Sequence, residues 1–170
     1  GTNLTSNYAD NVKSYLVSQC FDLTTLSSPV LKFDMAFDLE TDWDIVYVEY
    51  SIDNGLNWTI LGDASDANWY NSNTTQGQNN TCFNCPGSQW TGTDGNLNEY
   101  SKSLDAFASA TNFMARIVFH SDESVNQEGV IIDNFVITGN TLSTEEFSVD
   151  SFSIYPNPSN GLFHIKTSKS

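Results

Sequence analysis

Three acidic side chains occupy positions where the hydrophobic pattern predicts apolar surroundings. Asp133 lies inside an apolar segment, and in a regular strand its carboxylate would face the same side as Ile131 and Phe135. Asp44 stands at the head of another apolar segment, and Glu40 lies shortly before it, past the end of the preceding strand. A buried carboxylate is costly unless it is paired with a cation or binds a metal. These acids are therefore candidates for a metal site.

Calcium is the ion that this set of residues favours. Carboxylates from adjacent strand ends, together with backbone carbonyls and water, supply the oxygen-rich shell that calcium prefers. The sequence therefore predicts a calcium site formed by Glu40, Asp44 and Asp133. The alternative is that Asp133 only accepts hydrogen bonds from backbone amides, or lies at a strand end where side-chain alternation fails.

The overall charge supports a cation and argues against two other partners. Acidic residues outnumber basic residues 21 to 6, which leaves a net charge of −15. Such a charge repels nucleic-acid phosphates and anionic lipid headgroups, whereas a bound divalent cation would relieve it. No apolar run approaches the roughly 20 residues that a membrane-spanning helix needs. We therefore expect neither nucleic-acid binding nor membrane insertion.

The cysteines allow three kinds of chemistry. Cys82 and Cys85 form a CxxC pair in an Asn-rich segment, which is compatible with a disulfide, half a zinc site or a redox pair. Zinc would need two further ligands, and the chain offers only Cys20, His120 and His164. A redox pair is typical of a helix N-terminus in a βαβ unit, which the pattern does not show. A structural disulfide is favoured, with Cys20 as a buried free thiol.

No constellation of residues predicts an active site. His120, Ser121 and Asp122 are consecutive, and neighbouring residues on a strand point in opposite directions, so they cannot form a relay. The sequence contains no Gly-rich phosphate loop, HExxH or GxSxG motif. Carboxylates are numerous enough for a glycosidase pair, but nothing singles out two of them. We predict that the chain is not an enzyme.

Residues 63–96 form an unusually long polar connection that contains Trp69, Tyr70 and Trp90. Most loops have only about six residues, so a connection of this length is expected to be functional or disordered. Exposed aromatic rings can stack on sugar rings, which makes the three residues candidate ligand-binding positions. Alternatively, the rings are buried and close one end of the fold.

The elements that must position these residues follow a period of two. Leu31, Phe33 and Met35 alternate with Lys32 and Asp34, as expected for a strand with one buried face. Similar alternation, with a DNG turn at 53–55, predicts strands over 15–23, 31–40, 44–52, 57–61, 100–104, 113–120 and 129–139. No convincing helical repeat is present. The sequence therefore predicts an all-β fold, an antiparallel jelly-roll β-sandwich.

A family resemblance rests on two stretches, FDLTTLSSPVLKFDMAFDLETDWDIVYVEYSIDNGLNW and EGVIIDNFVITG. They resemble the jelly-roll accessory domains of the MAM-like and cleaved-adhesin type, found in secreted peptidases such as the gingipains. The likeness covers residues 10–139 and implies a non-catalytic domain that often binds calcium and serves adhesion or stabilises a neighbouring enzyme domain. By position, it implies Glu40, Asp44 and Asp133 as metal ligands, while Asn134 replaces a second Asp that relatives often have.

The segment SIYPNPSNGLFHI, residues 153–165, carries a second resemblance. Pro156 and Pro158 favour an extended turn, and Asn160 with Gly161 favours a hairpin bend, so strand, turn and strand are encoded locally. The segment is similar to the first strands of the C-terminal sorting domain that the type IX secretion machinery of Gram-negative bacteria reads. This resemblance implies export and an oxidised CxxC pair.

Together these features predict three segments: a jelly-roll accessory or adhesion domain (1–139), a linker (140–151) and the start of a sorting domain (152–170). The expected function is that of a non-catalytic, calcium-stabilised domain of a longer secreted or cell-surface protein, expected to be a peptidase. Its expected partners are the type IX secretion machinery and an upstream catalytic domain, or an extracellular protein or glycan. The alternative is a carbohydrate-binding module of a secreted polysaccharide-degrading enzyme.

Overall fold

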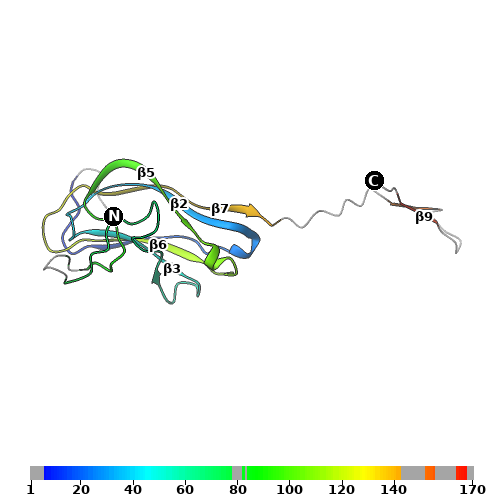
Figure 1. The fold of residues 1–170 in the computed structure, drawn as a ribbon, viewed down its shortest axis with the longest axis horizontal. Helices are drawn as coiled ribbons and strands as arrows, with labels where there is room; N and C mark the ends of the chain where they lie inside the picture. Colours follow the sequence, from blue (N-terminus) through cyan, green and yellow to red (C-terminus); the bar gives the residue numbers. More distant parts are fainter. Residues whose placement is uncertain (1–5, 78–81, 83, 143–151, 156–163, 168–170) are drawn as a thin grey trace.

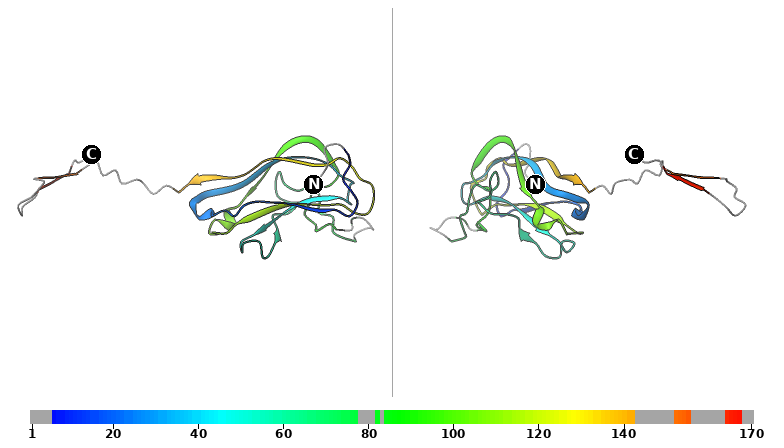
Figure 2. Two further views of the ribbon diagram at one scale, coloured as in Figure 1. Left: turned by 180° about the vertical axis from the view of Figure 1, so that it is seen from behind. Right: turned by 45° about the vertical axis from the view of Figure 1, so that its right-hand side comes forward.

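The computed structural model describes residues 6–77, 82, 84–142, 152–155 and 164–167. Within these residues the chain forms β-strands and two short 3₁₀ helices, and two antiparallel sheets face each other as a sandwich (Figure 1). The turned views show the same two layers (Figure 2). No helix in the described part of the chain is long and apolar enough to cross a bilayer. The predicted all-β sandwich is confirmed.

Each sheet joins strands that are distant in the sequence. The first has the order β1-β6-β3-β4, with β1 (Lys13–Val17), β6 (Met114–His120), β3 (Ile45–Ser51) and β4 (Thr59–Ile60). The second has the order β5-β2-β7, with β5 (Thr93–Ser103), β2 (Leu26–Asp38) and β7 (Gly129–Thr141). The 3₁₀ helices are η1 (Leu23–Thr25) and η3 (Asp105–Phe107). Every predicted strand overlaps an observed one.

The core lies between the two sheets and follows the alternation of the sequence. On β2, the side chains of Leu31, Phe33, Met35 and Phe37 are buried, while the residues between them are only half-buried. Successive side chains of a strand point to opposite faces, so this one strand lines the core with every second residue.

The predicted hairpin between β3 and β4 is confirmed. Asn54 and Gly55 have φ values of 60° and 81°, the left-handed conformation that tight hairpin turns require. The Ser51 hydroxyl donates to the Asp53 carboxylate at 2.7 Å and accepts the Gly55 amide at 2.9 Å. The Trp58 indole N–H donates to the Gly55 carbonyl at 2.9 Å, so side chains brace the turn on both sides.

A bulge in β7 reverses the side-chain alternation that the sequence predicted. Asn134 has a φ of 52°, close to a shift in the register between β2 and β7. Ile132 and Phe135 both pack against the core, although a regular strand would place them on opposite faces. Asp133 consequently lies exposed on the outer face, opposite Asp34. The prediction that Asp133 points toward the apolar layer is therefore wrong.

The cysteine predictions have different outcomes. Cys82 and Cys85 form a disulfide, and both residues are buried, so the predicted staple is confirmed. Cys20 is a free thiol but is exposed, which corrects the prediction that it is buried. The strand that was expected to cover Cys20 ends earlier, at Val17.

Replacing both Cys82 and Cys85 with Ser is expected to lower the free energy of unfolding by about 2 kcal/mol, because the crosslink closes only a short loop. Urea denaturation of the double variant measures the effect. The matched control is Cys20→Ser, which removes an exposed thiol and should stay within about 0.5 kcal/mol of the parent. Equal stability of the double variant and the parent would show that surrounding contacts hold this loop without the crosslink.

The C-terminal segment contains a separate two-stranded sheet, in addition to the two sheets of the sandwich. β8 (Phe152–Tyr155) pairs antiparallel with β9 (His164–Thr167), which confirms the two predicted strands. The predicted turn at 156–161 lies outside the described residues. The predicted linker begins too early, because β7 continues to Thr141; residues 143–151 also lie outside the described part.

Candidate metal centre

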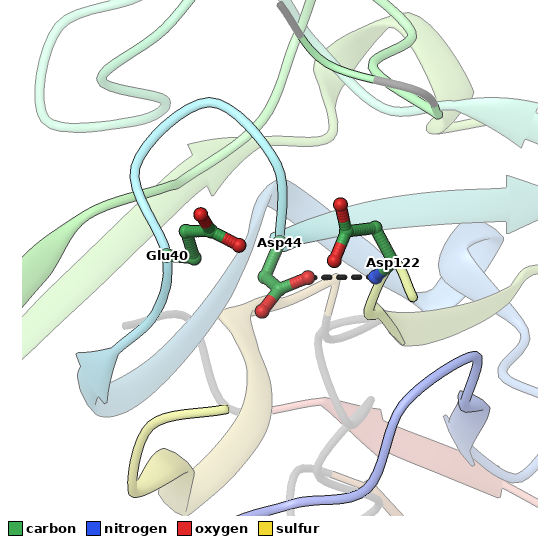
Figure 3. A group of neighbouring side chains, drawn as sticks. All are labelled: Glu40, Asp44 and Asp122. Carbon is green, nitrogen blue, oxygen red and sulfur yellow. Dashed lines mark hydrogen bonds between the residues drawn. The ribbon is translucent and has the colours of Figure 1, made fainter. Parts of the chain in front are cut away.

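Three carboxylates meet at one end of the sandwich. Glu40, Asp44 and Asp122 each offer an oxygen atom, and these oxygens all lie within 4.8 Å of one another (Figure 3). Glu40 and Asp44 belong to the turn between β2 and β3, and Asp122 follows the end of β6. Because β6 runs antiparallel to β3, with His120 opposite Ile45, the end of one strand meets the start of the other.

The turn between β2 and β3 directs Glu40 and Asp44 toward the same place. The Asp44 amide donates to the Glu40 carbonyl at 3.0 Å, and the Trp43 amide donates to the same carbonyl at 3.2 Å. Asp42 has a φ of 63°, which lets the chain reverse within a few residues. The Thr91 hydroxyl, from a distant part of the sequence, donates to the Asp44 carbonyl at 2.9 Å and holds the end of the turn.

Asp44 is the most deeply placed of the three acids, with 0% of its surface exposed. One carboxylate oxygen accepts the Asp122 amide at 2.7 Å, and the other accepts the hydroxyl of Tyr8. Burial raises the pKa of Asp44 because it disfavours the charged form, and these hydrogen bonds offset only part of that effect. The uncharged form of Asp44 is therefore favoured relative to an exposed aspartate.

Glu40 has an unpartnered oxygen. Its Oε2 atom is buried and has no hydrogen-bond partner within the part of the chain that the structure describes. Burial raises the pKa of Glu40, and the negative charges of Asp122 and Asp44 raise it further. None of the ion pairs found among the described residues involves a member of the cluster, so the described part of the chain places no Lys or Arg in an ion pair with these acids.

The arrangement fits a calcium ion in composition and in size. All three side chains offer oxygen, the donor that calcium prefers, and no sulfur or imidazole nitrogen belongs to the group. Calcium lies about 2.3–2.6 Å from its ligands, so oxygens that share one ion lie at most about 5 Å apart. The 4.8 Å spread of the three carboxylates meets this condition.

The structure brings together two of the three predicted ligands. Glu40 and Asp44 are in the cluster, whereas Asp133 lies on the outer face of β7. Asp34, the residue of β2 that pairs with Asp133, is separated from Glu40 by roughly 20 Å of extended chain, at a rise of about 3.3 Å per residue. Asp122 takes the third position, and sequence reasoning missed it. The sequence feature that could have identified Asp122 is an acid directly after a strand. The pairing of β6 with β3 is needed to bring that acid beside Glu40 and Asp44.

The candidate sugar platform is not at the surface. Only 4% of Trp69, 5% of Tyr70 and 0% of Trp90 is exposed, so these residues cannot stack on a glycan. The Trp69 and Trp90 rings lie edge-on to Phe33, with centroids 5.7 and 5.9 Å away. The Tyr70 hydroxyl is held by the backbone of Val48. The ligand-binding assignment of these three residues is wrong, because the connection folds its aromatic rings into the core.

The residues that follow β6 have structural partners. The Ser121 hydroxyl donates to the Ala9 carbonyl at 2.8 Å and accepts the Val12 amide at 3.0 Å. No hydrogen bond joins His120 to Ser121 or Asp122 in the described part of the chain. Burial lowers the pKa of His120, and the positive charge of Lys13 lowers it further. This stretch therefore connects chain segments rather than forming a nucleophile and its base.

The chain is similar to part of a longer known protein. It is 28% identical over 154 residues to Bacillopeptidase F of Bacillus subtilis (strain 168), a match that covers 88% of this chain. The match covers 9% of Bacillopeptidase F, so the chain corresponds to a small part of that protein. No protein-family model matches the chain. The similarity suggests an accessory domain of a larger protein, as the sequence resemblance implied.

Proposed function

We propose that this chain is a non-catalytic, calcium-stabilised accessory domain of a larger secreted peptidase. The observation that carries the proposal is the carboxylate cluster of Glu40, Asp44 and Asp122. One of its members is fully buried. Among the described residues, another has a buried oxygen without a partner, and none of the ion pairs includes a member of the cluster. A calcium ion would complete the coordination of these oxygens and neutralise their charge.

The accessory role is supported by the extent of the similarity. The chain matches only 9% of a protein named as a peptidase, so the similarity concerns a small part of that protein. The described residues place no base beside a nucleophile around His120, the one histidine in the sandwich. A stabilising or adhesive domain beside a separate catalytic domain accounts for both features.

Two features support export. The disulfide between Cys82 and Cys85 is of the kind that persists in oxidising, extracellular surroundings. The β8–β9 hairpin has the strand pairing expected from the resemblance of this segment to a type IX sorting domain. We propose that the type IX secretion machinery recognises the segment from residue 152 onward, and that the sandwich functions outside the cell.

Calcium titration of metal-stripped protein tests the proposal. One calcium ion is expected to bind per chain, with an affinity that Asp122→Asn lowers about tenfold or more, because the substitution removes a charged ligand. Isothermal titration calorimetry at neutral pH measures both stoichiometry and affinity.

The matched control is Asp133→Asn, which removes an exposed carboxylate outside the cluster and should leave calcium affinity unchanged. Absence of calcium binding to the parent chain would refute the proposed site. An equal loss in the Asp122→Asn and Asp133→Asn variants would also contradict it, because binding would then depend on overall charge.

A further inference from the structure

Residues 7–12, here called the N-terminal strap, cross the end of the sandwich that holds the carboxylate cluster. The strap is bonded mainly to one segment, residues 121–127, which follows β6 and carries Asp122. The Asn7 side chain donates to the Asn126 carbonyl (2.6 Å), and the Tyr8 amide donates to the Gln127 carbonyl (3.1 Å). The Asn11 amide donates to the Asp122 carbonyl (2.5 Å). The Ser121 hydroxyl donates to the Ala9 carbonyl (2.8 Å) and accepts the Val12 amide (3.0 Å).

Tyr8 connects the strap to the other half of the cluster. Its hydroxyl donates to the Asp44 carboxylate and accepts the Glu40 amide at 3.3 Å. The ring is buried, with 4% exposed, and lies edge-on to Phe119 at 5.0 Å. The strap therefore contacts all three members of the cluster: Asp44 and Glu40 through Tyr8, and Asp122 through the amide of Asn11.

The cluster and the strap hold the same two parts of the fold. Without a cation, the charges on the 40–44 turn repel the charge on Asp122, and this repulsion tends to separate the turn from segment 121–127. The strap can form all of its hydrogen bonds only when both parts are in place, because the Tyr8 hydroxyl bonds to the turn while the backbone of the strap bonds to segment 121–127. An ion shared by the three carboxylates would draw the two parts together and hold the docking surface of the strap in its bonded form.

Two buried oxygens in these same parts lack hydrogen-bond partners. They are Oε2 of Glu40, on the turn, and Oδ1 of Asn126, on the segment that receives the strap. Buried polar atoms are nearly always satisfied in folded proteins, so each of these atoms indicates a missing partner at this end of the sandwich. Oε2 of Glu40 belongs to the carboxylate cluster itself, where a cation bound by the three acids would be its partner.

We propose that calcium binding at the cluster locks the N-terminal strap onto the sandwich, with Tyr8 as the positioning residue that couples the two. This inference rests on the proposed calcium site. The ion would thereby hold the strap itself in place on the sandwich, which gives a stabilising accessory role a physical basis. By thermodynamic linkage, the factor by which calcium favours strap docking equals the factor by which docking strengthens calcium binding.

Hydrogen exchange of the whole chain, metal-stripped or saturated with calcium chloride, tests the inference. The amides of Tyr8, Asn11 and Val12 donate the bonds that hold the strap, so calcium is expected to slow their exchange about fivefold or more. Amides in the pairing of β2 with β5 lie in the other sheet and should not change. Calcium binding without added protection of the strap would overturn the inference and leave the proposed site standing.

Variants test the reverse direction of the coupling. Tyr8→Phe removes the hydroxyl that joins the strap to Asp44, and its calcium affinity is expected to fall about fivefold or more. Tyr15→Phe is the matched control on exposed β1 and should bind as the parent does. Ser121→Ala provides a second variant, because it removes the two hydroxyl bonds to Ala9 and Val12 without touching a carboxylate and keeps the backbone bond from the Ser121 amide to the Val12 carbonyl. Unchanged affinity in both strap variants would overturn the inference, whereas absence of calcium binding to the parent refutes the site itself.

Discussion

Calcium is expected to raise the free energy of unfolding far more at pH 7 than at pH 5. At a calcium concentration a thousandfold above the dissociation constant at pH 7, the increment at that pH is about 4 kcal/mol. The pKa values of Glu40 and Asp44 are raised, chiefly by burial. Protons therefore compete with the ion at pH 5, and the increment shrinks as the pH falls through the raised pKa values.

The sign follows from proton binding in the two states. A carboxyl group with a raised pKa binds protons in the folded protein at pH values where the unfolded chain has already lost them. Its contribution to stability is present below the unfolded pKa and is lost as the pH rises through the folded pKa. As Glu40 and Asp44 lose their protons with rising pH, the repulsion within the cluster grows in the metal-free protein, and this is the repulsion that calcium removes.

Urea denaturation at pH 5 and pH 7, with chelator or with excess calcium, measures the increments. His120 titrates in the same range with the opposite sign, because its pKa is lowered. Its effect is present with and without calcium and cancels in the difference. Asp122→Asn should lose most of the increment and Asp133→Asn should keep it. Equal increments at the two pH values would contradict the involvement of buried carboxylates.

Trp90→Ala is expected to lower the free energy of unfolding by about 4 kcal/mol, because a fully buried indole leaves a large cavity. The indole N–H donates to the Trp69 carbonyl at 3.1 Å, so the substitution also leaves a buried acceptor without its partner. The Trp90 backbone pairs with Val46, which makes this residue the point where the long connection joins β3. A loss of this size is a large fraction of the stability of a typical domain.

Chemical denaturation gives the free energy of unfolding of Trp90→Ala and of Trp58→Ala, and so compares the loss of a core ring with the loss of a ring stacked at the surface. Trp58 is half-buried and lies against the guanidinium of Arg116, 4.1 Å from its ring, so its loss should cost about 1 kcal/mol. A similar cost for both substitutions would show that the 63–96 connection packs loosely and is not part of the core.

Local patterns predicted the sandwich because they depend only on neighbouring residues. The alternation in β2 sets which of its faces is buried wherever the strand is placed. The Asp53, Asn54 and Gly55 turn adopts its left-handed conformation from the preferences of those residues. The Cys82–Cys85 pair is also local, because the two thiols are separated by only three positions.

The candidate site was predicted only as far as it is local. Glu40 and Asp44 belong to one turn, so their proximity follows from the sequence. Asp122 is 78 positions from Asp44, and only the antiparallel pairing of β6 with β3 brings them together. Asp133 was misplaced because a single left-handed residue, Asn134, shifts the alternation of β7.

The sequence by itself determined the strand pattern, the acidic character and the hairpin turns of this protein, because these depend on residue types and spacings along a few positions. Only the tertiary structure decided that Trp69 and Trp90 are core residues and that the strap reaches Asp44. Burial and long-range contacts depend on which strands become neighbours. That choice is made by the packing of the whole chain and leaves no signature in any short segment.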